Sequence, residues 1–263
     1  MRAPVLVDAT LEFIGTATTL LRLGPYTLLT DPDFRHRGHR AYLGKGLFSR
    51  RRTEPSRQPD TLPPLDAVLL SHLHGDHFDP IAREQLDHRL PLLTTPAASR
   101  RLTRWGFGQT HGVSTWETVT LAEGLRVTSV PGQHAPGAAR ALLPPVMGSV
   151  IEYSTVDERL RVYITGDTLY RPWLRDVVDR LGVPDAMVIH LGGTRAFGLL
   201  VTMDGRQGAD LVDLLAPAVT VPVHYDDYTV FRSPLEEFVR LARERRVPSA
   251  VRTVRRGETV SLI

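Results

Sequence analysis

Four side chains able to bind a metal fall within six consecutive residues, directly after a short apolar run at 66–71. They are His72, His74, Asp76 and His77. The run has the length and composition of a buried strand, so His72 and His74, two residues apart at its end, would point the same way. Asp76 and His77 would follow on the turn into the next helix. This density of ligand types favours a metal site over a solvated, histidine-rich loop.

Three further candidate ligands stand at the ends of other apolar runs. His134 follows the run at 125–130, Asp167 follows the run at 160–165, and His224 closes a third such run. Each alone could be a core histidine, or an aspartate that caps a turn. Together with the cluster they share one kind of position, the carboxyl end of a strand, and this favours a common site.

The absence of cysteine restricts the chemistry of such a site. The chain has 263 residues, ten histidines and no cysteine. Disulfides, thiolate catalysis, iron–sulfur clusters and cysteine-bound zinc are therefore excluded. A bound metal must be held by histidine nitrogen and carboxylate oxygen, and such a site accepts zinc, manganese or iron.

Strand and helix signals form two series along the chain. An arginine-, glycine- and proline-rich stretch at 31–64 shows neither the 3.6-residue period of a helix nor the two-residue alternation of a strand. It is expected to be a long loop with at most one helical turn. Asp79 and Pro80 can start a helix that runs to about His88. Other helices are expected at 97–105, 173–181, 204–215 and 234–245. Strands are expected at 11–14, 19–23, 26–30, 66–71, 91–95, 117–121, 125–130, 148–153, 160–165, 185–191, 218–224 and 258–263.

Each run of strands is followed by helices, and no sharp linker separates the two runs. This order predicts one α/β domain over residues 1–263, with two sheets layered between helices.

The ligand pattern resembles that of the metallo-β-lactamase-fold hydrolase superfamily. The resemblance lies in the His-x-His-x-Asp-His motif followed by a lone histidine, Gly-Asp and a second lone histidine, and it spans residues 11–224. Within the superfamily the chain is similar to the branch of ascorbate-phosphate lactonases and N-acyl-phosphatidylethanolamine phospholipases D. The branch markers are Ile14-Gly15-Thr16-Ala17-Thr18, Thr30-Asp31-Pro32, Leu191-Gly192-Gly193 and Thr202-Met203-Asp204. The resemblance implies an α/β (α+β) fold, a four-layer αββα sandwich.

The resemblance also assigns roles to the candidate ligands, for two divalent metal ions. The first ion would be held by His72, His74 and His134, and the second by Asp76, His77 and His224. Asp167 would bridge both ions, and Asp31 would steady the histidines from behind. Zinc is the expected metal, with manganese and iron as alternatives.

Two divalent ions that share a water lower its pKa and supply hydroxide at neutral pH. Asp76 could both bind a metal and orient that hydroxide. We therefore expect a dinuclear hydrolase in which the bridging hydroxide attacks a small, anionic ester, lactone or phosphodiester. The alternative is a non-catalytic binding or sensor protein that retains the fold and the metals.

Several other residues carry a functional and a structural interpretation. His190, at a strand end, could donate a proton to the leaving group or simply bond to backbone. Tyr225, directly after His224, could reach the substrate or pack in the interior. Thr16 stands where relatives in the branch usually carry histidine, which weakens inference about the substrate but not about the metals. The segment 131–147 is expected to form a wall of the pocket.

Positive charge is concentrated in an arginine-rich loop at 34–59. This loop has eight basic residues and one acid, whereas the whole chain has a net charge of +3. The loop could be a solvated surface, or an anion-attracting rim beside the metals that includes Arg50, Arg51 and Arg52.

Because the basicity is local, a small-molecule substrate is the expected partner and nucleic acid is not. The apolar runs are too short to span a membrane, and the N-terminus lacks a secretory signal, so a cytoplasmic protein is expected. The sequence leaves the oligomeric state open.

Overall fold

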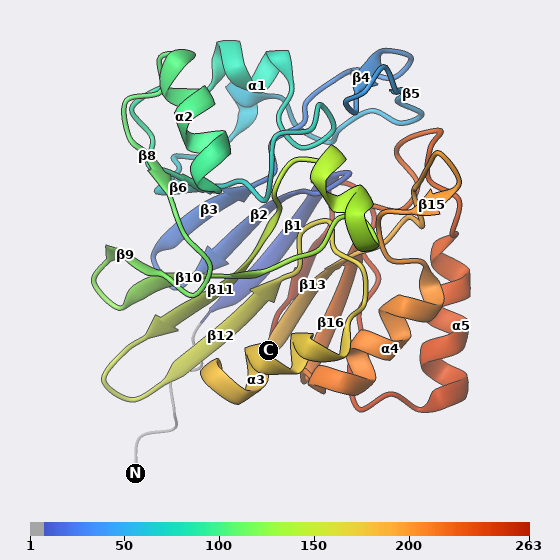
Figure 1. Ribbon diagram of the computed structural model, residues 1–263. Helices are drawn as coiled ribbons and strands as arrows, with labels where there is room; N and C mark the ends of the chain where they lie inside the picture. The colour runs from blue at the N-terminus through green and yellow to red at the C-terminus, as the bar shows by residue number, and fades with distance from the viewer. Residues whose placement is uncertain (1–7) are drawn as a thin grey trace.

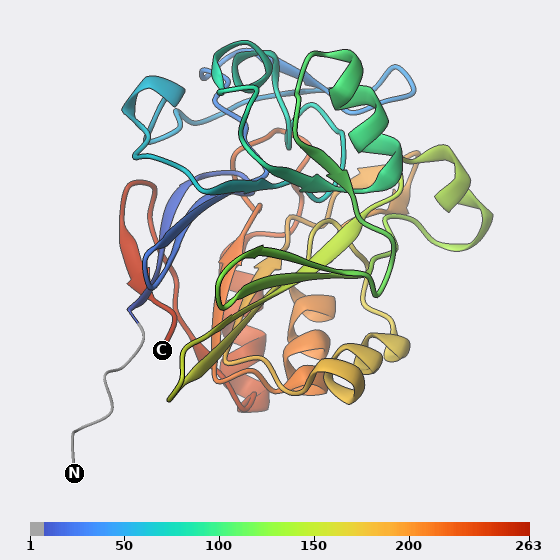
Figure 2. The same ribbon diagram turned by 90° about the vertical axis from the view of Figure 1, so that its left-hand side faces the viewer.

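The structure is built around two seven-stranded sheets that face each other, with helices on their outer faces (Figure 1). It is a computed structural model that describes residues 8–263. The view turned by 90° shows the layers in order: helices, first sheet, second sheet, helices (Figure 2). The predicted α/β (α+β) fold, a four-layer αββα sandwich, is therefore confirmed.

The first sheet mixes antiparallel and parallel pairing. Its order is β18 (Thr259–Ser261), β1 (Ala9–Gly15), β2 (Thr18–Leu23), β3 (Tyr26–Thr30), β6 (Ala67–Leu69), β7 (Leu92–Thr94) and β8 (Thr110–Gly112). β1 to β3 form an antiparallel meander, and β3, β6, β7 and β8 run parallel. The β2–β3 turn holds Gly24 at φ +57°, where an added Cβ would lie 2.6 Å from the Tyr153 hydroxyl, so glycine is required.

The second sheet repeats this plan with the later strands. Its order is β17 (Ala250–Val251), β16 (Val219–Val223), β13 (Ala186–His190), β12 (Arg159–Ile164), β11 (Met147–Ser154), β10 (Leu125–Pro131) and β9 (Thr118–Ala122). β9 to β12 are antiparallel neighbours, and β12, β13, β16 and β17 run parallel. Both sheets thus contain parallel strands whose carboxyl ends carry the loops with the candidate ligands.

Two groups of helices cover the sheets from opposite sides (Figures 1 and 2). α1 (Pro80–Gln85) and α2 (Pro96–Arg104) pack on the first sheet, and α3 (Arg175–Leu181), α4 (Gly205–Leu215) and α5 (Leu235–Arg245) pack on the second. Three buried clusters fill the three interfaces between layers. Adjacent strand residues enter different clusters: Leu21 faces the second sheet, whereas Leu20 faces the helices.

Three features of the fold correct the sequence predictions. The long loop at 31–64 contains a short hairpin, β4 (Arg40–Tyr42) and β5 (Phe48–Arg50), besides one 3₁₀ turn, η1 (Pro59–Thr61). β8 and β17 were not expected, nor was a second hairpin, β14 (Arg195–Ala196) and β15 (Leu199–Leu200). The helix after Asp79 ends at Gln85, before His88, because Leu86 turns extended to bury its side chain. Two further 3₁₀ turns are η2 (Gly137–Leu142) and η3 (Pro172–Leu174).

Within residues 8–263, no helix has both the length and the apolar character needed to cross a membrane. The prediction that the N-terminus lacks a secretory signal falls largely on residues 1–7, which lie outside the described residues.

Candidate metal centre

The structure brings all seven candidate ligands together at one edge of the two sheets. The cluster His72 to His77 occupies the loop between β6 and α1, whose first turn Asp79 caps by accepting a hydrogen bond from the backbone N–H of Ala82. His134 follows β10, Asp167 follows β12 and His224 follows β16. All seven side chains are buried. Because they come from both sheets, the centre forms only when the sandwich is closed.

Three histidines form a first compact group. His72 Nε2 lies 2.9 Å from His74 Nδ1, and His134 Nε2 lies 3.2 Å from the same atom. One ring nitrogen of each lies within 4.8 Å of the others. The three nitrogens could therefore bind one metal ion.

A second group consists of Asp76, His77 and His224. Asp76 Oδ2 lies 3.5 Å from His224 Nε2, and one ligand atom from each residue lies within 4.8 Å of the other two. Asp167 lies between the groups, with Oδ2 3.3 Å from His77 Nε2 and 3.8 Å from His134 Nε2. One carboxylate thus faces both groups, as a bridging ligand would.

Hydrogen bonds outside the cluster orient the histidine rings. His134 Nδ1 donates to the carbonyl of Val201 (2.8 Å), and His224 Nδ1 donates to the carbonyl of Leu191 (3.1 Å). In the neutral rings these bonds place the proton on Nδ1 and turn Nε2 toward the centre.

Asp31 holds His77 in the same way. Its Oδ2 lies 3.1 Å from His77 Nδ1, so Nε2 of His77 faces the centre. The same carboxylate accepts hydrogen bonds from the backbone N–H and the hydroxyl of Ser71. Asp31 therefore connects the end of β3 to the residue that precedes the ligand cluster.

Burial and the charges of neighbouring groups shift the pKa values of the candidate ligands in different directions. Burial and the neighbouring His77 lower the pKa of His72 well below its ordinary value, and burial lowers the pKa of His74 to about 3. Burial opposes ionisation of Asp167, but His224 and His77 hold its pKa well below the usual range. Burial likewise would lower the pKa of His77, but Asp167 and Asp31 raise it well above 6.5. The carboxylates and the imidazoles of His72 and His74 thus have the charge state that metal binding requires, whereas a metal at the second group would have to displace a proton from His77.

The donor set fits a divalent cation. Within residues 8–263, five buried atoms of the candidate ligands have no hydrogen-bond partner: His74 Nε2, His77 Nε2, His224 Nε2, Asp76 Oδ1 and Asp167 Oδ1. Buried polar atoms are costly to leave unpaired. The two carboxylate oxygens offer lone pairs to a cation, and the imidazole nitrogens do so once they lose their protons. Imidazole nitrogen and carboxylate oxygen suit zinc, manganese or iron.

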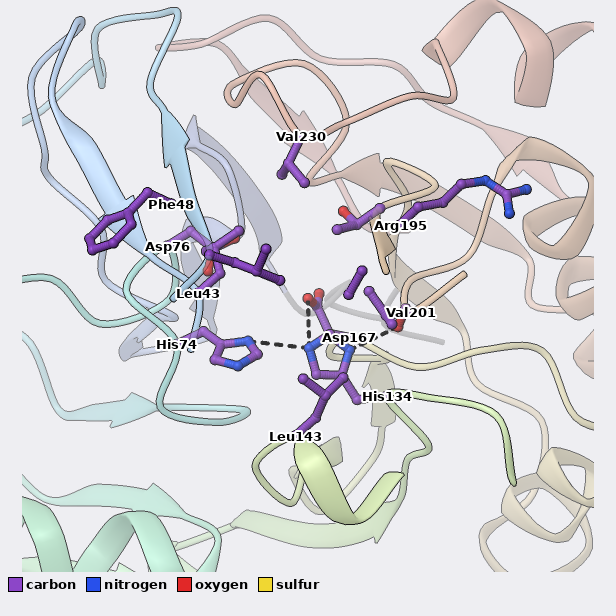
Figure 3. A pocket seen from close by; sticks show the side chains of 13 residues that line it. Leu43, Phe48, His74, Asp76, His134, Leu143, Asp167, Arg195, Val201 and Val230 are labelled. Carbon is purple, nitrogen blue, oxygen red and sulfur yellow. Dashed lines mark hydrogen bonds and ion pairs between the residues drawn. The ribbon is translucent and has the colours of Figure 1, made fainter. Parts of the chain in front are cut away.

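A small cavity of about 70 Å³ opens onto the centre. His74, Asp76, His134 and Asp167 line it on the side of the centre. Figure 3 shows the apolar side chains of Leu43, Leu143, Val201 and Val230 around the same space, while the guanidinium group of Arg195 points away from Asp167. Leu143 comes from the segment 131–147, which was expected to form a wall of the pocket.

His190 and Tyr225 lie away from this cavity. His190 is fully buried behind the ligands, with Nε2 3.4 Å from Asp31 Oδ2, and its backbone N–H donates to the Thr165 hydroxyl. Tyr225 packs against Phe13, with ring centroids 6.3 Å apart, and its hydroxyl lies 3.5 Å from the Val254 carbonyl. This placement favours the structural interpretation of both residues.

A buried ion-pair network behind the second group had no sequence signal. Asp33 and Asp227 flank Arg51, whose Nη1 donates to Asp33 Oδ2 at 2.7 Å and whose Nη2 lies 3.7 Å from Asp227 Oδ1. All three side chains are fully buried. Both interpretations of the arginine-rich loop, a solvated surface and an anion-attracting rim, are therefore wrong for Arg51.

The network contacts two of the segments that carry candidate ligands, the loop after β6 and the segment after β16. Arg35 pairs with Asp33 and donates to the carbonyl of Gly75, between His74 and Asp76. The backbone N–H of Thr16 donates to Asp227, and its carbonyl accepts from the N–H of His224. Thr16, which stands where related chains usually have histidine, thus contributes mainly backbone contacts.

Comparison with known proteins agrees with this geometry. A family model described as a β-lactamase superfamily domain matches residues 26–225. A metal-dependent hydrolase of Aeropyrum pernix is 24% identical to this chain over 266 residues, which cover 95% of this chain and 96% of that protein.

Two solved structures have the same fold. A possible metal-dependent hydrolase from Veillonella parvula matches with a TM-score of 0.84 at 20% identity, over 97% of this chain and 99% of that chain. An isothiocyanate hydrolase from Delia radicum gut bacteria matches with a TM-score of 0.80 at 20% identity, over 95% and 98%.

Proposed function

Because the chain belongs to the β-lactamase superfamily, we propose that it is a metal-dependent hydrolase with its active site at the buried histidine–aspartate centre. The observation that carries the proposal is the pair of three-residue ligand groups joined by Asp167. The name of the Aeropyrum pernix relative and the description of the Veillonella parvula structure support the same class of reaction.

We assign two metal positions to these groups. His72, His74 and His134 would hold one ion. Asp76, His77 and His224 would hold the second, and Asp167 would bind both. Zinc is the first expectation, with manganese and iron as alternatives. Two divalent ions, when bound, would act as Lewis acids and supply hydroxide at neutral pH.

The chain's own side chains would position the reactants. Asp76 lines the cavity and its Oδ1 has no partner within the described residues, so it can accept a hydrogen bond from the attacking water. Thr194 lines the same cavity with an unpaired hydroxyl, which can bind a polar atom of the substrate. The aliphatic walls exclude bulk water and favour a small, uncharged reacting group, such as an ester, a lactone or an isothiocyanate.

We further propose that residues 1–263 form one domain. The strand β18 pairs with β1 in the first sheet, and this contact between distant parts of the chain supports a single domain.

The first experiment combines metal analysis with a substrate screen on the purified chain. We expect bound divalent metal, and turnover of at least one compound in a panel of esters, lactones, phosphodiesters and isothiocyanates. His72→Ala combined with His74→Ala should remove at least one equivalent of metal and abolish turnover. His36→Ala combined with His39→Ala, at two exposed positions of the arginine-rich loop, is the matched control and should change neither.

The alternative, a metal-binding sensor, predicts another outcome. Bound metal without turnover across the whole panel would favour the sensor. Full activity of the His72→Ala/His74→Ala variant would contradict the assigned site.

A further inference from the structure

A second, larger cavity adjoins the metal centre. It measures about 420 Å³, and His74 lines both this cavity and the small one over Asp167. The β4–β5 hairpin contributes to both: Leu43 lines the small cavity, and the neighbouring Tyr42 and Gly44 line the large one. A molecule whose reacting end lies at the metals therefore has a second space available directly beside it.

Cationic side chains gather around this second cavity. Its lining includes four cations, Arg35, Lys45, Arg83 and Arg101, and one acid, Asp79. Arg35 is already paired with Asp33, and Asp79 caps α1. Within residues 8–263, the remaining three cations have no ion-pair partner, so the cavity carries a local excess of positive charge.

Two of the cations flank a flat apolar surface. The guanidinium carbons of Arg83 and Arg101 lie 4.7 Å and 5.0 Å from the ring centroid of Trp105. These cation–π contacts hold both groups at the cavity. Phe78 stacks on Trp105 with centroids 6.3 Å apart and extends the apolar surface toward the ligand loop.

Lys45 completes the set from the opposite segment. It lies between Gly44 and Gly46 at the tip of the β4–β5 hairpin, and all three residues have positive φ. It is also the only lysine in the chain.

We propose that this basic cavity is a subsite for an anionic group, a phosphate or a carboxylate, attached to the apolar body of the substrate. Guanidinium groups bind such anions with directed, charge-assisted hydrogen bonds, and Trp105 contacts the apolar part. The inference rests on the proposed hydrolase function, because it takes the bound molecule to be the substrate. It places the site that binds the negative charge of the substrate in the large cavity beside the metals.

Binding can be measured without catalysis. In a Trp116→Phe/Trp173→Phe protein, Trp105 is the one remaining tryptophan and reports on the cavity. Phenyl phosphate and benzoate should change its fluorescence saturably, and the neutral analogues phenol and benzamide should not. Inorganic phosphate tests whether the anion alone suffices.

Paired variants test the location. Arg83→Gln/Arg101→Gln should weaken binding of phenyl phosphate about tenfold or more. Arg100→Gln/Arg104→Gln removes the same charge from exposed positions of α2 outside the cavity and should leave binding unchanged. Equal affinity in both variants would place the anion elsewhere, for instance at the metals, and would overturn the proposal.

A second readout uses Lys45. Phenyl phosphate should slow its modification by an amine-reactive reagent, measured by peptide mass spectrometry, with the α-amino group of the chain as internal reference. Equal labelling with and without the ligand would contradict the proposal, even where substitution of the arginines disturbs folding.

A kinetic measurement separates this proposal from the proposed function. Two esters with the same reacting bond, one neutral and one with a distal carboxylate, are compared. Arg83→Gln/Arg101→Gln should raise KM for the anionic ester about tenfold and leave kcat and the neutral ester unchanged. If neither ester is hydrolysed, the result counts against the hydrolase proposal, and the binding measurements alone decide on the subsite. If both respond alike, the subsite is wrong and the hydrolase stands.

Discussion

Asp31 shows how one residue connects the framework to the proposed metal centre. It lies directly after β3 with a backbone φ of +35°, which is an uncommon conformation for a residue other than glycine. Its carboxylate accepts hydrogen bonds from Ser71 and faces His77 Nδ1. The strained backbone is therefore held by contacts that also orient a ligand.

Asp31→Asn should weaken metal binding, because an amide nitrogen would replace the acceptor that faces His77 Nδ1. Loss of such an outer partner reduces metal affinity about 10- to 100-fold. Competition with a chromophoric chelator measures the change. The control is Asp66→Asn. Asp66 precedes β6, at the end of that strand away from the candidate ligands, and accepts a hydrogen bond from the backbone N–H of Thr27, so this variant should retain wild-type affinity. Unchanged affinity in Asp31→Asn would contradict the role given to Asp31.

Arg51 is the largest fully buried side chain, and it neutralises Asp33 and Asp227. Arg51→Met should lower the free energy of unfolding by about 3–5 kcal/mol, because it leaves two buried carboxylates with one fewer cation. Arg52→Met, at the exposed neighbouring position, should change it by no more than about 0.5 kcal/mol. Urea unfolding followed by circular dichroism compares the two. Equal stability of both variants would show that the network is not coupled to folding.

The gathering of the candidate ligands could be predicted from sequence and the ion-pair network could not, for a physical reason. The candidate ligands lie at the end of an apolar run or on the turn that follows it, so a local pattern reveals their positions. Asp33, Arg51 and Asp227 meet only through the fold, and in the sequence Arg51 is one of three identical arginines. Which of the three is buried depends on the β4–β5 hairpin beside them. The strands of that hairpin are too short to show an alternation of apolar and polar residues.

At the scale of elements, the helices and the longer strands followed the sequence pattern, as did the three-residue strands β6, β7 and β18, which lie inside longer predicted runs. Six other short strands did not. β4, β5, β8, β14, β15 and β17 each have two or three residues, too few for an alternation to be recognised. These strands are held by their neighbours; Arg40, for example, pairs with Arg50 across the β4–β5 hairpin. Part of the wall of the small cavity belongs to the β4–β5 and β14–β15 hairpins, which is why sequence alone could not describe the pocket.

The contact between α4 and α5 depends on a glycine. A Cβ added at Gly205, the first residue of α4, would lie 2.8 Å from the backbone nitrogen of Phe238 in α5. Gly205→Ala should therefore cost about 1–3 kcal/mol, although alanine favours a helix more than glycine does. Arg206→Ala, exposed at the next position, should be nearly neutral. Thermal unfolding of the two variants measures the difference, and a gain in stability from Gly205→Ala would show that the helices can separate without cost.

For the molecule as a whole, the alternation of strands and helices was enough to predict the four layers. The order of strands within each sheet was not predictable, because pairing partners such as β18 and β1 are distant in sequence. Tertiary contacts decide such pairings.

Metal binding should stabilise the whole chain. A metal at 100 times its dissociation constant contributes about 2.7 kcal/mol if it binds the folded state alone. For a chain of this size that corresponds to a rise in Tm of about 5–10 °C over chelator-treated protein. Differential scanning fluorimetry measures the shift, and the His72→Ala/His74→Ala variant should show a smaller one. An identical Tm with and without metal would contradict a centre built from both sheets.

The chain order of the ligands also bears on when an ion can enter. His224 leaves the ribosome last of the seven, and β18, which completes the first sheet beside β1, is synthesised later still. The proposed second metal position would therefore be incomplete until His224 has been synthesised. Its ion would come from the metals that the chain meets after that point, so expression in media of different metal content should yield different occupants of one unchanged fold.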